Sequence, residues 1–320
     1  MKRDSIIIYV SSRNNYDMLE NEVLKNINTE GFEFINVDDN SSVNELNKGK
    51  AICKQHDVVF LKNKDRGVQM ATQTLIDYVN ENRPNCKWIV CFQHDIYPIS
   101  KNFFSKLNKY IQSDKLDDFG IVGFNVLDHG NYTLNSLQEF DRGESPLGMI
   151  GMCHLSIRDN SKRWLCTKRQ TELLKQEVWR SPFIVEFPMW AAVGINVSNW
   201  NKHIIATNQY HFHLWLPDIA MQFNHKNKPC LILPNLYCLN NQSLKEKYNI
   251  NKNSAQGAMQ GNDYHFGEYS NFEAWKDRWG WHYENVHEYS DVIEQHYANT
   301  LILEFFNHNI NNGPLRSFNI

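Results

Sequence analysis

One carboxylate stands where a predicted strand ends. Asp95 follows the apolar segment 88–92, with Gln93 and His94 between them. A carboxylate held at the end of a strand can bind a hard divalent cation, Mn²⁺ or Mg²⁺, while the oxygens of a diphosphate supply further ligands. Asp95 could instead cap a helix, but the next predicted helix begins only beyond Ser100, which weakens that explanation. The position therefore predicts a cation site.

Two neighbouring carboxylates follow another predicted strand. Asp38 and Asp39 come directly after the apolar segment 32–37 and begin the polar run Asp-Asp-Asn-Ser-Ser. Carboxylates at this place can accept hydrogen bonds from the N–H group of a base or from ribose hydroxyls. The same residue types also favour turns without any ligand. Both interpretations stay open on these residues alone.

Asp218 stands in a different setting. Pro217 precedes it, and an apolar helix is predicted from 218 to 225. The carboxylate could cap this helix, or it could face a cleft as a general base that takes a proton from a hydroxyl nucleophile. The sequence permits both roles at once.

Strands and helices in regular alternation must position these groups. Short apolar segments, rich in β-branched residues, predict four buried strands at 6–10, 32–37, 58–61 and 88–92. Amphipathic helices are predicted at 17–27 and 68–79. This alternation is typical of an open parallel α/β sheet, in which ligands bind at the carboxyl ends of the strands. The carboxylates at 38, 39 and 95 fall at such ends.

The rest of the chain predicts fewer elements. Strands are expected at 120–126, within 183–197 and at 230–233, where Pro234 would end the strand, and helices at 103–111, 271–279 and 289–307. The stretch from 128 to 180 shows no regular pattern. No internal repeat or long low-complexity linker marks a domain boundary.

Composition argues against several functional classes. The 320 residues include 33 Lys and Arg against 36 Asp and Glu, a net charge of −3, so the basic excess of proteins that bind nucleic acid or anionic lipid is missing. The apolar run at 6–10 is too short for a signal peptide, and no segment approaches the roughly 18 apolar residues of a transmembrane helix. None of the 7 cysteines forms a Cys-x-x-Cys pair, which indicates reduced thiols in a cytoplasmic protein.

The sequence also lacks the glycine-rich motifs of other α/β proteins. No Gly-x-Gly-x-x-Gly follows the first strand, and neither a Walker-type motif nor a Gly-x-Ser-x-Gly elbow occurs. We therefore expect no Rossmann dinucleotide site, no P-loop and no hydrolase nucleophile.

Four segments, taken in order, resemble glycosyltransferases of the GT-A fold, and among them the large family-two group of inverting enzymes. They are the opening strand and loop at 6–14, Val-Asp-Asp-Asn-Ser at 37–41, Phe-Gln-His-Asp-Ile-Tyr-Pro at 92–98 in the place of the Asp-x-Asp metal motif, and Trp-Leu-Pro-Asp-Ile-Ala at 215–220 in the place of the catalytic base. Asn63, Gly67 and Ala71 fit the family's helix entry before the metal strand. The resemblance covers residues 5–243.

The resemblance implies a fold and a division of the chain. We expect an α/β protein of the GT-A, Rossmann-like fold, with a mostly parallel central sheet flanked by helices and a C-terminal helical extension. Residues 1–243 would form the catalytic domain, with 1–125 as the nucleotide-sugar half and 126–243 as the acceptor half. Residues 244–320 would form the helical extension packed on it.

The resemblance also implies an activity. Such an enzyme moves a sugar from a nucleotide-diphosphate sugar, with a UDP-sugar favoured here, to a hydroxyl of a glycan or other acceptor by direct displacement and inversion. Asp218 would be the catalytic base, and Asp95 would bind Mn²⁺ or Mg²⁺. The residues expected to bind the donor are Val10, Ser11, Arg13, Asp38, Asp39, Arg66, Gln93 and His94. The aromatic residues expected to pack on a sugar acceptor are Trp190, Trp215, Trp279 and Trp281.

Two places depart from the family pattern. Gln93 stands where the family usually has the first aspartate of its metal motif, and residues 240–243 stand where a histidine often completes the metal shell, for which His265 could substitute. These departures favour one alternative, a non-catalytic carbohydrate-binding relative. A second alternative, a sugar-nucleotide pyrophosphorylase, needs a glycine-rich basic loop after the first strand, and residues 11–15 contain no glycine.

Overall fold

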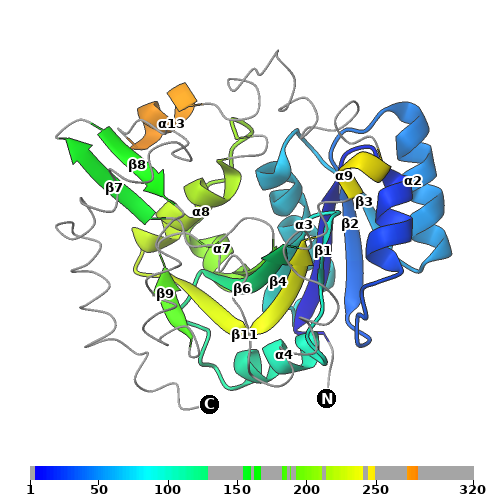
Figure 1. The fold of residues 1–320 in the computed structure, drawn as a ribbon, viewed down its shortest axis with the longest axis horizontal. Coiled ribbons are helices and arrows are strands. Elements are labelled where there is room, and N and C mark those ends of the chain that lie inside the picture. Colours follow the sequence, from blue (N-terminus) through cyan, green and yellow to red (C-terminus); the bar gives the residue numbers. More distant parts are fainter. Residues whose placement is uncertain are drawn as a thin grey trace.

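A nine-stranded mixed sheet forms the centre of the protein (Figure 1). The computed structural model describes residues 4–128, 154–159, 162–166, 182–185, 188, 192–210, 214–240, 244–248 and 272–279. The strands lie in the order β3-β2-β1-β4-β10-β6-β11-β5, and β9 pairs with β11 beside this path. Helices lie on both faces of the sheet, which confirms the predicted α/β class.

The four predicted N-terminal strands are confirmed as the parallel part of the sheet. They are β1 (Ile6–Ser12), β2 (Glu33–Asp38), β3 (Val59–Lys62) and β4 (Trp88–Phe92). β1 lies between β2 and β4, and β3 pairs with the outer side of β2. In this register Ser12 lies opposite Asp38, and Val10 lies opposite Phe92. The predicted strand ends therefore meet at one edge of the sheet.

Beyond β4 the sheet becomes mixed. Its strands there are β5 (Ile96–Pro98), β6 (Ile121–Asp128), β9 (Phe183–Val185), β10 (Ala192–Asn196) and β11 (Cys230–Asn240). β10 runs antiparallel between β4 and β6, whereas β11 runs parallel to β6. The prediction that Pro234 ends the last strand is wrong, because β11 shifts its register between Leu233 and Tyr237 and then continues.

A second, two-stranded sheet lies within the stretch for which no regular pattern was found. Strand β7 (His154–Asp159) pairs antiparallel with β8 (Lys162–Cys166). The expectation of an irregular chain is therefore wrong for these residues. The helix predicted at 289–307 lies outside the described residues.

The helices before β6 include one that the sequence patterns missed. They are α1 (Tyr16–Met18), continued by the π-helical segment η1 (Leu19–Leu24), then α2 (Val43–Gln55), α3 (Val68–Asn82) and α4 (Phe103–Gln112). Helix α2 was not predicted, although Ser42 caps it by accepting a hydrogen bond from the backbone N–H of Glu45. Its amphipathic signal is weak because only Gly49, Ile52 and Cys53 of its residues are buried.

The later helices are α7 (Val197–His203), α8 (Trp215–Asn224), α9 (Leu244–Lys247) and α13 (Phe272–Trp279). Residues of α3, α7 and α8 share one hydrophobic cluster with one face of the sheet, and α13 joins it through Ala274. Residues of α1, α2 and α4 share the other cluster with the opposite face. The sheet is therefore buried on both sides, as its continuous apolar strands require.

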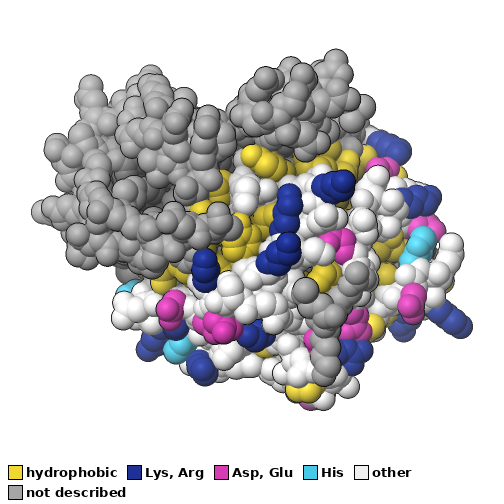
Figure 2. Space-filling view, turned by 90° about the horizontal axis from the view of Figure 1, so that it is seen from below, with side chains coloured by type: hydrophobic (Ala, Val, Ile, Leu, Met, Phe, Trp, Pro, Cys, Tyr) yellow, Lys and Arg dark blue, Asp and Glu magenta, His cyan; other side chains and the backbone are white. Residues whose placement is uncertain are grey.

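The described surface carries charges of both signs. Seen from below, basic and acidic side chains intermingle around apolar strips (Figure 2). Within the part of the chain that the structure describes, no helix is long and apolar enough to cross a membrane. Five cysteines of this part are buried free thiols, at 53, 86, 91, 230 and 238, and burial raises the pKa of Cys91 to about 12.

Candidate active site

Short contacts join the loops that follow β1, β2 and β4. Ser12 Oγ lies 2.7 Å from Nε2 of His94, which connects the end of β1 with the loop after β4. The backbone N–H of Asp39 donates to the carbonyl oxygen of Ser12 at 2.7 Å, which connects β1 with the loop after β2. Three of the predicted polar segments therefore meet at the carboxyl edge of the parallel strands, where α/β sheets bind ligands.

Asp39 holds the loop that leads into α3. Its Oδ1 accepts hydrogen bonds from Asn63 Nδ2 and from the backbone N–H of Gly67, each at 2.8 Å. Gly67 precedes α3 with a φ of 100°, which a residue with a side chain rarely adopts. Asp39 is 6% exposed. The predicted donor-binding residue therefore also fixes the entry of α3.

Asp38 lies beneath this edge and is fully buried. Its Oδ2 accepts the hydroxyl proton of Tyr16 at 2.6 Å, and its Oδ1 accepts the backbone N–H of Ser41 at 3.1 Å. Burial and the nearby Asp38 carboxylate raise the pKa of Tyr16 far above its usual value. The described contacts of Asp38 are thus to the protein itself.

The loop after β4 carries the remaining predicted ligands. The backbone N–H of Ile96 donates to the carbonyl oxygen of Gln93 at 3.1 Å, which forms a turn around His94 and Asp95. Asp95 is 6% exposed. Burial lowers the pKa of His94 to about 4, so the imidazole is neutral near pH 7.

The other predicted donor-binding residues differ in their exposure to solvent. Val10 is buried in the cluster that β1 shares with α1, α2 and α4, so its side chain points into the core. Ser11 and Arg13 are partly exposed at the end of β1. Arg66 is partly buried in the loop that Asp39 holds, and its backbone N–H donates to Asp65 Oδ1 at 2.7 Å.

Asp218, the predicted base, is completely buried in the first turn of α8. Its Oδ2 accepts from Gln69 Nε2 at 2.8 Å and from Gln222 Nε2 at 2.9 Å. Its Oδ1 accepts from Trp279 Nε1 at 2.9 Å and lies 3.2 Å from Arg278 Nε. Burial raises the pKa of Asp218, and Arg278 together with the hydrogen bonds lowers it by less. In this arrangement four groups of the protein surround the carboxylate.

These four partners were not predicted from the sequence. Gln69 and Gln222 lie on buried helix faces, where a polar side chain needs a partner. A glutamine at an apolar helix position was therefore the sequence feature that could have indicated these contacts. Gln69 lies two positions after Gly67, which donates to Asp39. The first turn of α3 therefore connects the carboxyl edge of the sheet with Asp218.

The tryptophans expected to pack on a sugar acceptor lie in different places. Trp279 contacts Asp218, and Trp215 is buried in the core. Trp190 and Trp281 lie outside the described residues.

The residues near Asp95 fit a cation that arrives with a nucleotide. No group of three or more His, Cys, Asp and Glu side chains that could hold a metal occurs among the described residues. Asn240, whose buried Oδ1 has no hydrogen-bond partner, pairs with Ile96 directly after Asp95. One or two carboxylates plus substrate phosphates are a usual shell for Mg²⁺. Asp95 can supply the carboxylate, whereas His265 and residues 241–243 lie outside the described residues.

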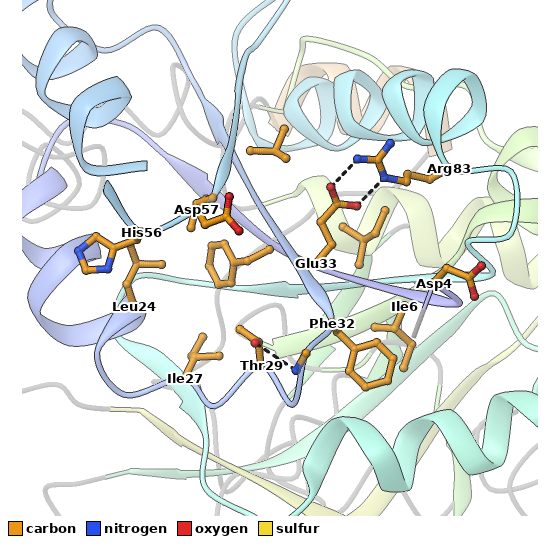
Figure 3. Close-up of a pocket in the computed structure, with 15 residues that line it drawn as sticks. Asp4, Ile6, Leu24, Ile27, Thr29, Phe32, Glu33, His56, Asp57 and Arg83 are labelled. Atoms are coloured by element: carbon orange, nitrogen blue, oxygen red, sulfur yellow. Dashed lines mark hydrogen bonds and ion pairs between the residues drawn. The ribbon is translucent and has the colours of Figure 1, made fainter. Parts of the chain in front are cut away.

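A cavity of about 560 Å³ lies at the other edge of the sheet (Figure 3). It is lined by residues around the amino ends of β1, β2 and β3, and Glu33 and Arg83 form a two-pronged ion pair at 2.7 Å in its wall. None of the predicted site residues lines it.

No protein-family model matches the sequence, and no curated protein matches it. Among solved structures, GalNAc-T7 in complex with UDP, GalNAc and Mn²⁺ is similar, with 12% identity, a TM-score of 0.51 and coverage of 92% of this chain and 58% of that chain. The mannosyltransferase PcManGT from Pyrobaculum calidifontis, in complex with GDP-Man and Mn²⁺, has 11% identity, a TM-score of 0.44 and coverage of 73% and 56%. The chain thus spans less than two thirds of these proteins. The likeness to GalNAc-T7 confirms the predicted GT-A fold.

Proposed function

We propose that this protein is a glycosyltransferase. It would move a sugar from a nucleotide-diphosphate sugar, with a UDP-sugar favoured, to a hydroxyl of a glycan or other acceptor. The observation that carries the proposal is the junction of Ser12, Asp39 and His94, which places the predicted nucleotide-binding and cation-binding segments side by side. The GT-A fold is compatible with this activity but does not by itself establish it.

The donor would bind along the carboxyl edge of β1, β2 and β4. Asp39 and the partly exposed Ser11 would contact the nucleoside, and Arg13 and Arg66 would lie toward the diphosphate. A divalent cation held by Asp95 would neutralise charge that develops on the leaving diphosphate. Since the net charge is −3, the positive charge for the donor has to be local.

Asp218 is our proposed general base, with inversion at the anomeric carbon. In the described arrangement Arg278 and Trp279 both contact its Oδ1. An acceptor hydroxyl could reach this oxygen only after α13 moves away. The proposal therefore includes a displacement of α13 when the acceptor binds, whereas Gln69 and Gln222 would keep holding Oδ2.

One observation favours a second candidate. Because four protein groups already surround the Asp218 carboxylate, the chain could instead be a non-catalytic relative that binds a nucleotide sugar or glycan. No described contact favours the pyrophosphorylase alternative. The buried free thiols support a cytoplasmic location, which we propose as well.

The activity is tested by a screen of nucleotide sugars for hydrolysis in the presence of Mn²⁺. We expect slow release of UDP from one UDP-sugar, and we expect Asp95→Ala to reduce it by about tenfold or more, because a cation ligand is lost. Matched Asp114→Ala removes an exposed carboxylate whose partner is Lys87 and should leave the rate unchanged. Nucleotide-sugar binding without any hydrolysis or transfer would favour the non-catalytic candidate.

A further inference from the structure

Two glutamine side chains hold the same oxygen of Asp218, and the main chain after α7 holds each glutamine in turn. Gln69 Nε2 and Gln222 Nε2 donate to Asp218 Oδ2 at 2.8 and 2.9 Å. The backbone N–H of Thr207 donates to Gln69 Oε1 at 2.8 Å. The backbone N–H of Ile205 donates to Gln222 Oε1, also at 2.8 Å. Each amide therefore lies between a carboxylate oxygen that accepts and an N–H group that only donates.

These contacts fix the orientation of both amides. A turn of either amide by 180° would bring its oxygen against the Asp218 carboxylate and its NH₂ group against a backbone N–H, so both hydrogen bonds would be lost. Gln69 is 0% exposed and Gln222 is 7% exposed, so water has little access to replace the lost partners. The two side chains can therefore only donate to Oδ2.

The other oxygen of Asp218 is held by a different element. Trp279 Nε1 donates to Oδ1 at 2.9 Å, and Arg278 Nε lies 3.2 Å from it. Both residues belong to α13, the helix that an acceptor has to displace in the proposed function. The donors to Oδ2 belong to α3 and α8, whose buried residues pack in one cluster with the sheet. The donors to the two oxygens thus differ in whether they stay in place when α13 moves.

We propose that Gln69 and Gln222 are positioning residues that give the two oxygens of Asp218 different roles. They keep Oδ2 occupied and leave Oδ1 as the oxygen that takes the proton of an acceptor hydroxyl. The inference rests on the proposed function, because it assumes that Asp218 is the general base. The proton passes to Oδ1 as the acceptor oxygen bonds to the anomeric carbon, and the diphosphate leaves with the electron pair of the broken bond.

The two amides also keep the base ionised when α13 moves away. Burial raises the pKa of Asp218, while Arg278 and the hydrogen bonds lower it. Without Arg278 and Trp279, the N–H groups on Oδ2 are the described contacts that still favour the charged form. Tyr210 stays neutral beside Asp218, because burial and that carboxylate raise its pKa, and Asp277, which acts on Tyr210, belongs to α13. Base function therefore depends on the two glutamines.

The pKa of Asp218 tests the inference without any substrate. It is measured by ¹³C NMR of the side-chain carboxyl groups, with the Asp218 signal assigned as the one that Asp218→Asn removes. We expect Gln69→Leu and Gln222→Leu each to raise this pKa by about one to two pH units, because each removes a hydrogen bond to a charged acceptor. Gln73→Leu is the matched control, because this amide lies one turn further along α3 and its hydrogen bonds go to other residues. An unchanged pKa in both folded variants would overturn the inference.

The consequence for the reaction is measured as the pH dependence of UDP release from the UDP-sugar that the wild type hydrolyses. Release should rise with pH as Asp218 ionises, and in Gln222→Leu this rise should lie about one to two pH units higher. The affinity for UDP should stay the same, because α8 carries none of the predicted donor-binding residues. Gln69→Leu is the second test variant if Gln222→Leu does not fold.

The two measurements separate this inference from the proposed function. The same pH dependence in the wild type and in the folded glutamine variants contradicts the positioning role alone. A raised pKa of Asp218 in these variants, in a chain that neither hydrolyses nor transfers any nucleotide sugar, contradicts the proposed function and with it the role of Oδ1 as the base.

Discussion

Buried carboxylates do most of the positioning at the candidate site. Asp39 holds the loop before α3 through Asn63 and Gly67. Asp218 lies between α3, α8 and α13 and accepts from side chains of all three helices. Because a buried carboxylate must find donors, each of these residues ties together segments that are far apart in the sequence.

Removing the Asp39 carboxylate should therefore destabilise the fold. In Asp39→Ala two buried donors lose their acceptor, and each unsatisfied group costs about 1–3 kcal/mol. Asp17→Ala is the control, because Asp17 is exposed and pairs with Lys48, so its loss should cost less than about 1 kcal/mol. Urea unfolding measures the free energy of unfolding of both variants. An equal decrease in the two variants would contradict the role assigned to Asp39.

The raised pKa of Asp218 predicts how the contribution of this residue to the stability of the fold depends on pH. The folded state holds the proton of this carboxyl more tightly than the unfolded state does, so the contribution to stability is present at low pH and is lost as pH rises through the folded pKa. Asp218→Asn removes the titration. The free energy of unfolding of the wild type relative to this variant should therefore fall as pH rises above the unfolded pKa of about 4. A rise over that range, measured by urea unfolding, would show that Arg278 outweighs burial.

The described polar contacts of helix α13 reach α8 and the segment before it. Arg278 pairs with Asp218 and donates to the carbonyl oxygen of Ile205 at 3.2 Å. Trp279 donates to Asp218 and stacks on His225, with ring centroids 5.5 Å apart. Helix α13 thus covers the proposed base in the described arrangement. An acceptor hydroxyl would have to displace the contacts that Arg278 and Trp279 make with Asp218.

Arg278→Ala should destabilise the protein more than an exposed arginine pair does. Asp218 is fully buried, and removal of one partner of a buried pair typically costs about 3–5 kcal/mol. Arg83→Ala breaks the partly exposed pair with Glu33 and should cost about 1 kcal/mol or less. Unfolding in urea compares the two. A larger loss for Arg83→Ala would contradict the anchoring of α13 at Asp218.

Helix α2 approaches Tyr16, the residue that donates to Asp38, closely at Gly49. A Cβ atom at Gly49 would lie 2.3 Å from Cζ of Tyr16, so Gly49→Ala forces the ring or α2 to move. We expect a loss of about 1–3 kcal/mol in the free energy of unfolding. Lys50→Ala, at an exposed neighbouring position, should have little effect. A stabilising Gly49→Ala would show that Tyr16 is placed differently.

The sequence predicts the carboxyl edge of the sheet better than it predicts the side-chain contacts behind that edge. Strands β1, β2 and β4 are buried, β3 is partly exposed, and all four have apolar runs with polar exits, features that are local in the sequence. Two of the partners of Asp218, Trp279 and Gln69, lie 61 and 149 residues away in the sequence, so no local pattern announces them. The same holds for the contacts of Tyr16 with Asp38 and of Ser12 with His94, which join positions 22 and 82 residues apart. Asn14 and Asn15 adopt positive φ values of 57° and 56° at the exit of β1, a conformation that asparagine tolerates better than most residues.

The central claim is that a nucleotide diphosphate binds with a cation at the carboxyl edge of β1, β2 and β4. It is tested most directly by titrating UDP into the wild type and into Asp95→Ala, each with and without Mn²⁺. We predict that Mn²⁺ tightens UDP binding to the wild type and leaves binding to Asp95→Ala unchanged. Equal Mn²⁺ dependence in both proteins would contradict the account.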